Sequence, residues 1–573
     1  MKKKVSQPEK KFKPELIYGL VISICALIVY FPGLKNGLLN WDDNIYVTTN
    51  EMIKSPANLD LFFGEFFFGN YHPLTLFSYS IIYHFSELDP YLYHLVNIVF
   101  HVVNSLLVFY LVFLLFKNIN LAFIVAILFT VHPMHVESVA WISELKDVQY
   151  TFFFLLSLIF YIKHIRQKSW KFYSLSVAFF VLSLLTKGQA VTLFVVLLLI
   201  DFIEKNSIRK NFTEKIPFLL LSVGFGIIAV IAQKSDNTIS DFSKISFFEQ
   251  TALASYGFTM YVIKTIFPFD ISAFYPYPTL INGKIPVGYW YFLSVVPVTI
   301  AALYFTFKKN RMIFYGLAFF IINIFLLLQI IPVGNCIMAD RYSYIPSIGL
   351  YLIIGHLFIR YFLNSKFKYL FILTFMGYLL FLGNYTLAQT KNWKNDFTLW
   401  NSVLEINPDI PTALVLRGYA YNETGEYNKA LVDLNRSISI DNKYGMAYLN
   451  RGVSKARLGY FKESLSDFQK ALDYKIEKRF LPELYVSWGG ALANTGDLNG
   501  AMECFTKSIE LNPKNPGVFN NRGITYGMMG KNKEALDDFN MALKLDPKNV
   551  DAMKNKQMII KIINNGLPVQ KTP

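Results

Sequence analysis

The hydrophobic positions along this chain change their period once, close to residue 390. Before that point, apolar runs of about 20 residues recur between short polar loops, and a helix of this length crosses the ~30 Å hydrocarbon layer of a bilayer. After it, apolar positions follow the period of amphipathic helices, with glycine and proline between them. The pattern predicts an all-α chain with a polytopic membrane bundle at 1–390 and a second helical domain at 391–573.

Eleven apolar segments are long enough to be read as membrane spans. They run over about 15–31, 92–116, 121–138, 148–164, 172–186, 189–203, 216–233, 287–307, 312–331, 343–362 and 367–388. The stretch 250–268 is also apolar, but it carries Lys264 and ends at Pro268, so we expect an interfacial or re-entrant helix there. In the long segment 32–91, phenylalanine-rich positions 61–68 predict an amphipathic helix on the outer membrane surface.

Lysine and arginine in the short loops predict the orientation of the bundle. The basic stretches are the N-terminus and residues 163–168, 204–215, 308–311 and 360–368. Eleven crossings place all five on the cytoplasmic side and the C-terminal domain on the exoplasmic side. The N-terminus also has features of a signal peptide, but no small-residue cleavage pattern follows it, so we expect an uncleaved first helix.

Three sets of small residues repeat in register within the C-terminal domain. They are Gly418, Gly452, Gly489 and Gly523; Gly425, Gly459, Gly496 and Gly530; and Ala430, Ser464, Ala501 and Ala535. Their common spacing of 34, 37 and 34 residues is typical of tetratricopeptide repeats, in which small residues let paired helices approach. The longer step predicts a short insertion near 475–482. Stacked repeats form a concave groove suited to an extended peptide, or a dimerisation surface.

Composition narrows the class of protein. A chain that is 53% hydrophobic and only 17% charged is typical of a membrane protein. The net charge of +15 then fits cytoplasmic loops and lipid headgroups, and no basic, aromatic-rich stripe indicates nucleic-acid binding. No P-loop, dinucleotide fingerprint or nucleophile elbow is present, which argues against ATP and nicotinamide. Cys25, Cys336 and Cys504 form no disulfide or zinc pattern.

The first candidate site is the pair Asp42-Asp43, which follows Trp41 just beyond the first apolar segment. An ionised carboxylate at a membrane surface needs water, a cation or a partner. One aspartate could act as general base toward a hydroxyl, while the other holds that hydroxyl or a divalent cation, Mg²⁺ or Mn²⁺. The simpler alternative is a helix cap or a turn, which aspartate also favours.

A second polar group lies at the outer end of the third and fourth predicted spans. It comprises His132, His135, Glu137, Glu144, Lys146 and Asp147, with Trp141 among them. His and Glu are metal-ligand types, but His-Pro-x-His lacks the i,i+4 face of a helical zinc motif, so we assign no metal site. Hydrogen bonding to a sugar or a phosphate is the favoured interpretation.

Two further cations lie on the same side, Lys187 after the fifth span and Arg341 before the tenth. Positive residues are disfavoured there, and an anionic donor phosphate would account for them, because arginine binds phosphate bidentately. Lys146 could contact the same phosphate. The alternatives are local ion pairs, such as Arg341 with Asp340 or Lys146 with Asp147 or Glu144, and snorkelling of the lysines. A donor that reaches this face should be carried by the membrane.

Taken in order, these motifs resemble one family. The chain has Asn40-Trp41-Asp42-Asp43, then His132 to Glu137 with Lys146-Asp147, then Leu185-Thr186-Lys187, then Asp340 to Ser347, then the repeats. This order resembles the transmembrane and tetratricopeptide-repeat-containing O-mannosyltransferases over nearly the whole chain. The resemblance implies the GT-C glycosyltransferase fold, a polyprenyl-phosphate sugar donor and a hydroxyl acceptor on an exoplasmic protein.

The resemblance also implies roles for residues at matching positions. An acid in the first outer loop is the base in that fold, which implies Asp42 or Asp43. Lys146 and Arg341, joined by Lys187, would hold the donor phosphate. The residues that would shape the sugar pocket are His132, His135, Glu137, Trp141 and Tyr342. The chain departs from the family at Gly188, where relatives often have Glu after the Lys, and in its short array of about four and a half repeats.

We therefore predict an inverting glycosyltransferase in a bacterial inner membrane, whose sugar is mannose or another hexose and whose repeats bind the acceptor protein or another partner. Three alternatives stay open. A membrane-anchored repeat scaffold would not need eleven spans. A transporter would carry charges at mid-bilayer, whereas these lie at the outer ends. A glycan polymerase or ligase using a diphosphate-linked oligosaccharide is not separated from our prediction by the sequence.

Overall fold

The computed structural model describes residues 13–207, 211–235, 245–330 and 334–565. The basic N-terminal run through residue 12 and part of the 204–215 loop therefore lie outside the described residues. The chain divides into two compact units, residues 1–402 and 403–573, which are described separately. The boundary predicted after residue 390 lies close to the end of the last long helix of the first unit, at Asn392, and twelve residues before the boundary between the two compact units.

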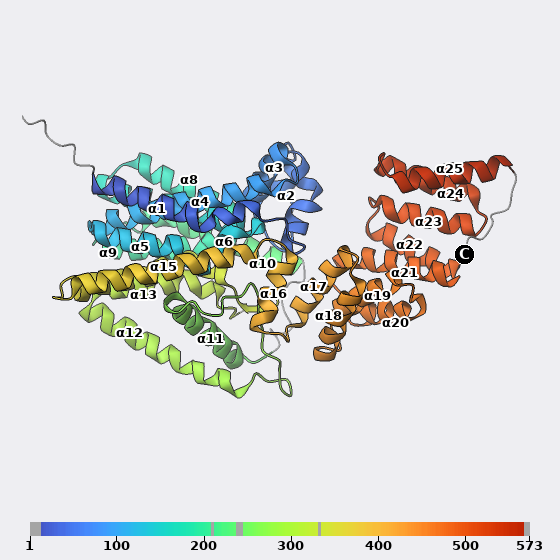
Figure 1. Cartoon of the computed structure of the whole chain (residues 1–573). Helices are drawn as coiled ribbons and strands as arrows, with labels where there is room; N and C mark the ends of the chain where they lie inside the picture. The colour runs from blue at the N-terminus through green and yellow to red at the C-terminus, as the bar shows by residue number, and fades with distance from the viewer. Residues whose placement is uncertain (1–12, 208–210, 236–244, 331–333, 566–573) are drawn as a thin grey trace, which may run out of the picture. The chain divides into compact units, whose positions relative to one another are not determined.

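The first unit is a bundle of helices (Figure 1). Its helices are α1 (Pro14–Tyr30), α2 (Leu59–Gly64), α3 (Pro73–Ser86), α4 (Pro90–Phe116), α5 (Ile119–Val131), α6 (Val136–Ala140), α7 (Leu145–Gln167), α8 (Trp170–Thr186), α9 (Leu193–Ile203), α10 (Ile216–Ser235), α11 (Phe247–Ile266), α12 (Val295–Lys309), α13 (Arg311–Ile324), α14 (Ser347–Leu357), α15 (Lys368–Asn392) and α16 (Asp396–Ile406), which runs into the second unit. Two short strands, β1 (Tyr275–Pro276) and β2 (Cys336–Met338), form an antiparallel pair.

Within the described residues, six helical segments are long and apolar enough to cross a membrane. The count becomes seven if α5 and the following Pro133–Ala140 segment, bent by 57°, form one broken span. Four shorter apolar helices cover Trp170–Thr186, Gly188–Ile203, Arg311–Leu327 and Ser347–Phe362. Together these segments coincide with all eleven predicted ranges. The prediction of a helical membrane protein is confirmed, and the number of crossings stays a prediction.

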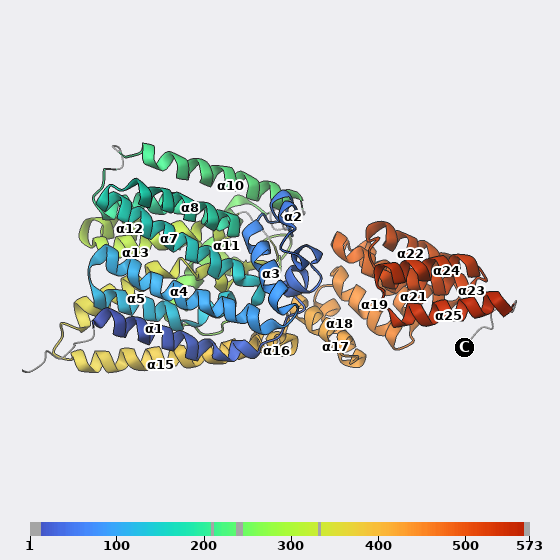
Figure 2. The same cartoon turned by 90° about the horizontal axis from the view of Figure 1, so that it is seen from above.

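The basic ends of several helices share one end of the bundle. Figures 1 and 2 show that α1 and α15 begin, and α12 ends, at the same end, whereas α2, α3 and α16 lie at the opposite end. Lys308 and Lys309 close α12, and Lys368 opens α15. The acidic loop after α1 and the basic turns therefore lie at opposite ends of the bundle, as the predicted orientation requires.

The segment before α4 differs from expectation. A single amphipathic helix over 61–68 is wrong, because α2 ends at Gly64 and the chain then turns back through a Phe67–Asn70 bridge. Phe68 and Gly69 in that turn both have positive φ, 51° and 66°, which no helix accommodates. The stretch 250–268 is helical as expected: α11 buries Ala252, Leu253 and Tyr261, and its position in the membrane stays a prediction.

The second unit consists of antiparallel helix pairs. Its helices are α17 (Pro411–Glu423), α18 (Tyr427–Ile440), α19 (Gly445–Arg457), α20 (Phe461–Asp473), α21 (Leu481–Thr495), α22 (Leu498–Leu511), α23 (Pro516–Met528), α24 (Asn532–Leu545) and α25 (Val550–Asn565). The predicted insertion is a 3₁₀ turn at Lys478–Phe480 between α20 and α21. The predicted repeat architecture is confirmed, and the small residues explain it.

Each small residue of the repeat has a visible steric role. A Cβ atom at Gly452, Gly489 or Gly523 would lie 2.7–2.8 Å from a phenylalanine ring of the paired helix. The glycines that follow the first helix of each pair have φ between +77° and +90°, which closes the turn. The third set, Ala430 and its equivalents, is fully buried between helices. The period is therefore set by close helix contacts.

Two adjacent glycines of α21 test this steric reading. We expect Gly489→Ala to destabilise the repeats by about 1–3 kcal/mol, because the added methyl overpacks against Phe505. Gly490→Ala is the matched control: nothing lies within 4 Å of its Cβ position, so it should stabilise by about 0.5–1 kcal/mol through helix propensity. Amide hydrogen exchange of α21 and α22 in the full-length protein measures both effects. Equal effects of the two substitutions would contradict the packing explanation.

Candidate functional site

The loop that carries Trp41-Asp42-Asp43 is attached to the elbow between α15 and α16. The Asn36 side-chain amide donates to the Thr390 carbonyl at 3.1 Å, and the Gly37 N–H donates to the Lys394 carbonyl at 2.9 Å. The Asn40 N–H donates to Asp396 Oδ1 at 2.9 Å. Burial is the main reason that the pKa of Asp396 is raised, and the Asn40 bond offsets it in part. These contacts fix the backbone immediately before the two aspartates.

Asp43 is fully buried and bonded to backbone and hydroxyl donors. Its Oδ2 accepts the Leu39 N–H at 3.1 Å, and its Oδ1 accepts both the N–H of Ser143, at 2.9 Å, and the Ser143 hydroxyl. Burial raises the pKa of Asp43 to about 7, although these hydrogen bonds oppose the rise. Asp43 therefore ties the loop to the turn before α7, and its oxygens face protein donors.

Asp42 has a different environment from its neighbour. Its residue is partly exposed, whereas Asp43 is not. The pKa of the Tyr46 hydroxyl is raised, first by burial and then by the negative charge of Asp42. The pKa of the Cys336 thiol is raised by burial, by the charge of Glu137 and, more weakly, by the charge of Asp42. Asp42 is thus close enough to Tyr46 and Cys336 for its charge to act on both, and it stays partly exposed.

Aromatic rings hold Trp41 beside the acidic pair. Its ring stacks on Trp141 with centroids 4.4 Å apart and meets Trp400 edge-on at 5.1 Å. Trp141 in turn lies 5.4 Å from Trp393. Because each ring is large and restricted to few rotamers, this cluster limits movement of the loop at low entropic cost.

The turn between α5 and α7 brings the second polar group to the same end. The helix breaks at His132-Pro133, and short helical segments lead to α7 at Leu145. Buried side chains donate to backbone carbonyls along this turn: Thr386 donates to Val131 at 2.6 Å, Tyr79 to Ile142 at 2.9 Å, and Asn97 to Trp141 at 3.0 Å. The bent backbone therefore stays hydrogen-bonded and presents its polar residues inward.

One buried carboxylate, Glu144, joins all three predicted phosphate-binding cations. The Glu144 carboxylate lies 3.2 Å from Lys146 Nζ, 3.4 Å from Lys187 Nζ and 3.4 Å from Arg341 Nε. Its own side chain is 1% exposed, whereas the three cations are 12–16% exposed. The cations therefore surround the buried Glu144 and keep part of their surface open.

Two more carboxylates balance this cluster. Glu137 pairs with the Arg341 guanidinium and accepts the Arg341 N–H at 2.9 Å, and Asp147 pairs with Lys187. Tyr46 and Trp141 add cation–π contacts, with Lys146 Nζ 4.7 Å from the Tyr46 ring centroid. Three cations with three carboxylates form a neutral cluster that a phosphate could enter by replacing carboxylate contacts. The sequence motifs at Lys146, Lys187 and Arg341 thus meet in space.

The β1–β2 pair positions Arg341. Tyr275 of β1 donates its hydroxyl to the Asp340 carboxylate, with oxygen–oxygen distances of 3.0 and 3.1 Å. Lys264 of α11 donates to the carbonyls of Phe269 and Asp270 at 2.8 and 2.9 Å, and its charge lowers the pKa of nearby Asp340. Burial outweighs that effect and raises the pKa of Asp340 to about 8. Asp340 therefore bonds to Tyr275 and does not pair with Arg341.

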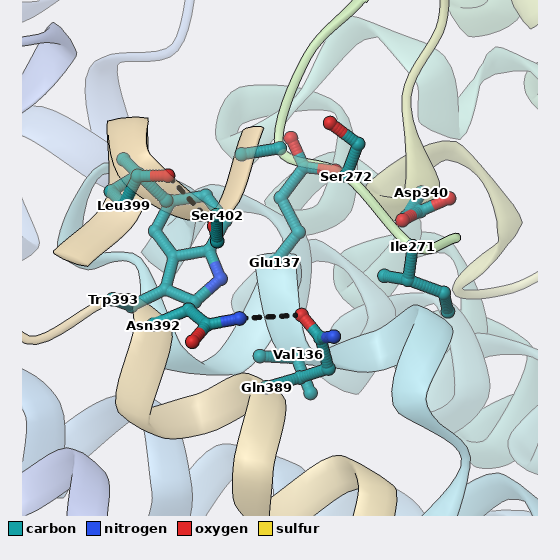
Figure 3. Close-up of a pocket in the computed structure, with 11 residues that line it drawn as sticks. Val136, Glu137, Ile271, Ser272, Asp340, Gln389, Asn392, Trp393, Leu399 and Ser402 are labelled. Atoms are coloured by element: carbon teal, nitrogen blue, oxygen red, sulfur yellow. Dashed lines mark hydrogen bonds between the residues drawn. The ribbon is translucent and has the colours of Figure 1, made fainter. Parts of the chain in front are cut away.

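A small cleft with a volume of about 10 Å³, partly open to solvent, adjoins the ion cluster (Figure 3). Its lining residues are Val136, Glu137, Ile271, Ser272, Ala273, Asp340, Gln389, Asn392, Trp393, Leu399 and Ser402. Glu137 contributes to both the cleft and the cluster, because it also binds Arg341. Of the residues predicted for the sugar pocket, Glu137 lines this cleft.

The remaining predicted pocket residues lie around the cleft or in the core. His132 and His135 are completely buried, with hydrogen bonds from His132 to Thr265 at 3.1 Å and from His135 to Ser347 at 3.1 Å. Trp141 stacks in the aromatic cluster, and the Arg341 guanidinium lies 5.0 Å from the Tyr342 ring. Their roles toward a sugar stay predictions. Among the described residues, no three His, Cys, Asp or Glu side chains gather as a metal site.

Known proteins are similar to this chain both in the repeats and in the helical bundle that precedes them. Tetratricopeptide repeat family models match residues 411–444 and 517–549, and a TPR repeat model matches 489–530. Protein O-mannosyl-transferase F38B6.6 of Caenorhabditis elegans is 27% identical over 70% of this chain and 59% of its own length. Protein O-mannosyl-transferase TMTC3 of Homo sapiens is 23% identical over 95% of this chain and 65% of its own.

The chain is similar to protein O-mannosyl-transferases over most of its length, and its second unit carries tetratricopeptide repeats. It spans about six-tenths of the length of these curated relatives. Among solved structures, the crystal structure of the TPR protein YrrB covers 29% of this chain and 84% of its own, at 21% identity and a TM-score of 0.25.

The sequence does not reveal which carboxylates organise the site. It predicts Glu144 and Asp147 as local partners of Lys146, whereas in the structure both also contact Lys187. The contact of Lys146 with the Tyr46 ring has no signal in the sequence. A signal for Glu144 existed, because an acidic residue at the end of a span needs a cation partner, but only the fold shows which cations supply it.

The central position of Glu144 leads to a stability prediction. We expect Glu144→Gln to destabilise the full-length protein by about 3–5 kcal/mol, because three partly buried cations lose their common counter-charge. Thermal unfolding in detergent measures the loss. The control is Glu51→Gln, which removes an exposed ion pair with Lys54 and should change stability little. Equal melting temperatures for Glu144→Gln and wild type would show that the cluster does not depend on Glu144.

Proposed function

We propose that this chain is a membrane glycosyltransferase that moves a hexose, with mannose favoured by the names of its homologues, to a hydroxyl of a protein acceptor. The observation that carries the proposal is that Lys146, Lys187 and Arg341 meet at Glu144. The loop that carries Asp42 is bonded to the residue next to Glu144, through Asp43 and Ser143. A partly exposed carboxylate beside a cluster of cations suits the deprotonation of a hydroxyl next to a leaving phosphate.

The donor is a sugar linked to a polyprenyl phosphate. Two features support this choice: the cations lie at the ends of apolar helices, and the three charges suit one phosphate group. Arg341 can bind two phosphate oxygens at once, and the lysines act as point charges. A lipid-linked donor reaches this position by diffusing within the bilayer, so no soluble nucleotide sugar needs to enter.

The reaction is one displacement. The acceptor hydroxyl gives its proton to Asp42 as its oxygen forms a bond to the anomeric carbon. The bond from that carbon to the phosphate oxygen breaks, and the electron pair leaves with the polyprenyl phosphate. Lys146, Lys187 and Arg341 stabilise the charge that develops on the phosphate. Attack opposite the leaving group inverts the anomeric configuration.

Asp42, rather than Asp43, is the base in this proposal. Asp43 accepts hydrogen bonds from Leu39 and Ser143 and is fully buried, so an incoming hydroxyl has no route to its oxygens. Asp42 is partly exposed and lies on the side of Tyr46 and Cys336. The buried aspartate positions the exposed one.

The described residues hold no group of three metal-ligating side chains, and this proposal assigns no residue to a divalent cation such as Mg²⁺ or Mn²⁺. A divalent cation could also arrive bound to the donor phosphate. Measuring the rate of sugar transfer with and without a metal chelator tests whether the reaction needs one.

The repeats recruit the acceptor polypeptide or a partner protein in this proposal. The chain would lie in a bacterial inner membrane with the repeats on the exoplasmic side. The family-model matches support repeats of a protein-binding class, and a concave solenoid surface suits an extended segment.

Two single substitutions test the catalytic assignment. Asp42→Asn should reduce sugar transfer from labelled polyprenyl-phosphate mannose to membrane acceptors by about 10²–10⁴-fold, because it removes the base, and thermal stability should stay unchanged. Asp43→Asn is the matched control: it should lower the melting temperature, because the amide cannot accept every hydrogen bond that Asp43 accepts. Full activity in Asp42→Asn would exclude the assignment. A wild type active only with diphosphate-linked oligosaccharides would favour the ligase alternative, and one inactive with every donor would favour the scaffold.

A further inference from the structure

The residue before α3 is a buried histidine with an unpaired ring nitrogen. His72 is 4% exposed and stands at the N-cap position of α3, but its side chain makes no cap hydrogen bond. Its Nε2 atom has no hydrogen-bond partner among the residues that the structure describes. A buried polar nitrogen without a partner costs free energy, and a ligand with a suitable acceptor would recover that cost.

Aromatic contacts hold the His72 ring on the Lys146 side of the ion cluster. The ring centroid lies 5.4 Å from that of Tyr46, and Lys146 Nζ lies 4.7 Å from the same Tyr46 ring. Phe67 meets the His72 ring edge-on, with centroids 6.4 Å apart. Because three rings pack together, the imidazole has few alternative orientations, and its position relative to Lys146 is restricted.

A hydrogen bond joins the first turn of α3 to the residue before Lys187. The Thr75 hydroxyl donates to the Thr186 carbonyl at 2.9 Å, and both threonines are completely buried. The Thr75 N–H donates to the His72 carbonyl at 3.1 Å, so the same turn fixes the histidine backbone. His72 is therefore held close to Lys187 as well as to Lys146.

The charges of both lysines act on His72. Burial, then the charge of Lys146 and then that of Lys187, lower the pKa of His72 to about 3, and the charge of Glu144 opposes them only in part. The imidazole is therefore neutral near pH 7, and a neutral imidazole carries one N–H. That N–H can donate a hydrogen bond without adding a fourth positive charge to the cluster.

We propose that His72 is a further ligand of the donor phosphate and donates a hydrogen bond from Nε2 to a phosphate oxygen beside Lys146 and Lys187. This inference rests on the proposed function and adds a residue to its donor site. The three cations already exceed the single negative charge of a phosphate that links a lipid to a sugar. A fourth ligand therefore contributes most as a neutral, directed donor, and its bond to an ionised oxygen is stronger than one to a neutral acceptor.

A second unpaired nitrogen lies beside the remaining cation of the cluster. The Trp141 indole nitrogen is buried and has no hydrogen-bond partner within the described parts of the chain. The Arg341 guanidinium lies 5.6 Å from the Trp141 ring. Unpaired nitrogen atoms thus occur near Lys146 and near Arg341, as expected where an anion completes the hydrogen bonding.

Two substitutions at His72 separate a hydrogen bond from a packing role. His72→Phe keeps a ring against Tyr46 and removes the nitrogen, whereas His72→Gln keeps a side-chain N–H. The matched control is His84→Phe, which changes an exposed histidine of α3. Because His72→Phe replaces an unpaired buried nitrogen by carbon, the melting temperature of the full-length protein should not fall.

Binding is measured on the full-length protein in detergent by isothermal titration. The probe is polyprenyl phosphate without a sugar, and polyprenol, the same lipid with a neutral hydroxyl, reports contacts with the hydrocarbon chain. His72→Phe should weaken binding of polyprenyl phosphate about tenfold and leave the weaker binding of polyprenol unchanged. His72→Gln should stay within about threefold of the wild type, and His84→Phe should equal it. With polyprenyl-phosphate mannose as substrate, His72→Phe should raise the donor KM by the same factor at unchanged kcat.

Binding and transfer together distinguish two failures. If His72→Phe weakens binding of polyprenyl phosphate but the wild type transfers no sugar, the proposed function fails and the assignment of His72 stands. If Asp42→Asn abolishes transfer while His72→Phe changes neither phosphate binding nor the donor KM, the proposed function stands and His72 is not a ligand. Equal weakening of polyprenyl phosphate and polyprenol, or a lower melting temperature in His72→Phe, would also overturn the assignment, because the side chain would then act through packing.

Discussion

The membrane unit depends on one electrostatic constraint, the shared burial of Glu144 among three cations. A single buried carboxylate would be costly, and so would any one of Lys146, Lys187 or Arg341 largely buried without a counter-charge. Together with Glu137 and Asp147 they form a neutral set that brings the start of α7, the end of α8 and the turn before α14 together. Helices far apart in sequence are therefore held at one point, and that point contains the predicted phosphate ligands.

A second constraint connects this cluster to the loop after α1. Asp43 is bonded to Ser143, two residues from Trp141 and one from Glu144, while Asn40 is bonded to Asp396 of α16. The acidic loop is thus fixed from both sides, by the turn that carries the cations and by the elbow that follows the last long helix. Asp42 is the acid of this loop that stays partly exposed, and the contacts of its neighbours Asn40, Trp41 and Asp43 hold it in place.

The sequence predicts the features that depend on local periodicity. Apolar runs locate every long helix of the bundle, because span length is a property of the segment itself. The repeat register is equally visible, since each glycine at a helix crossing leaves its mark at a fixed interval. A single helix over 61–68 is a failed prediction of the same kind: the phenylalanines fit a helix, but the positive φ at Phe68 and Gly69 reverses the chain.

Features that depend on tertiary contacts could not be predicted in the same way. Asp42 and Asp43 are identical, adjacent residues, so the sequence does not show which one is buried. The hydrogen bond from Ser143 shows that it is Asp43. Likewise, three of the four repeats have an Arg–Asp ion pair between their two helices: Arg417–Asp433, Arg451–Asp467 and Arg522–Asp538. In the third repeat of the series, the equivalent residues are Trp488 and Cys504. The substitution of both residues is visible in the sequence, but only the paired helices show that the two positions face each other as an ion pair in the other repeats.

Glu137 borders two different environments. On one side it neutralises Arg341, so the cation cluster is balanced until an anion replaces a carboxylate contact. On the other side it lines a small cleft that has no lysine or arginine among its described lining residues. Arg341 can therefore accept an anion only by giving up its contact with Glu137, and the cost of leaving that buried carboxylate without a counter-charge opposes the exchange.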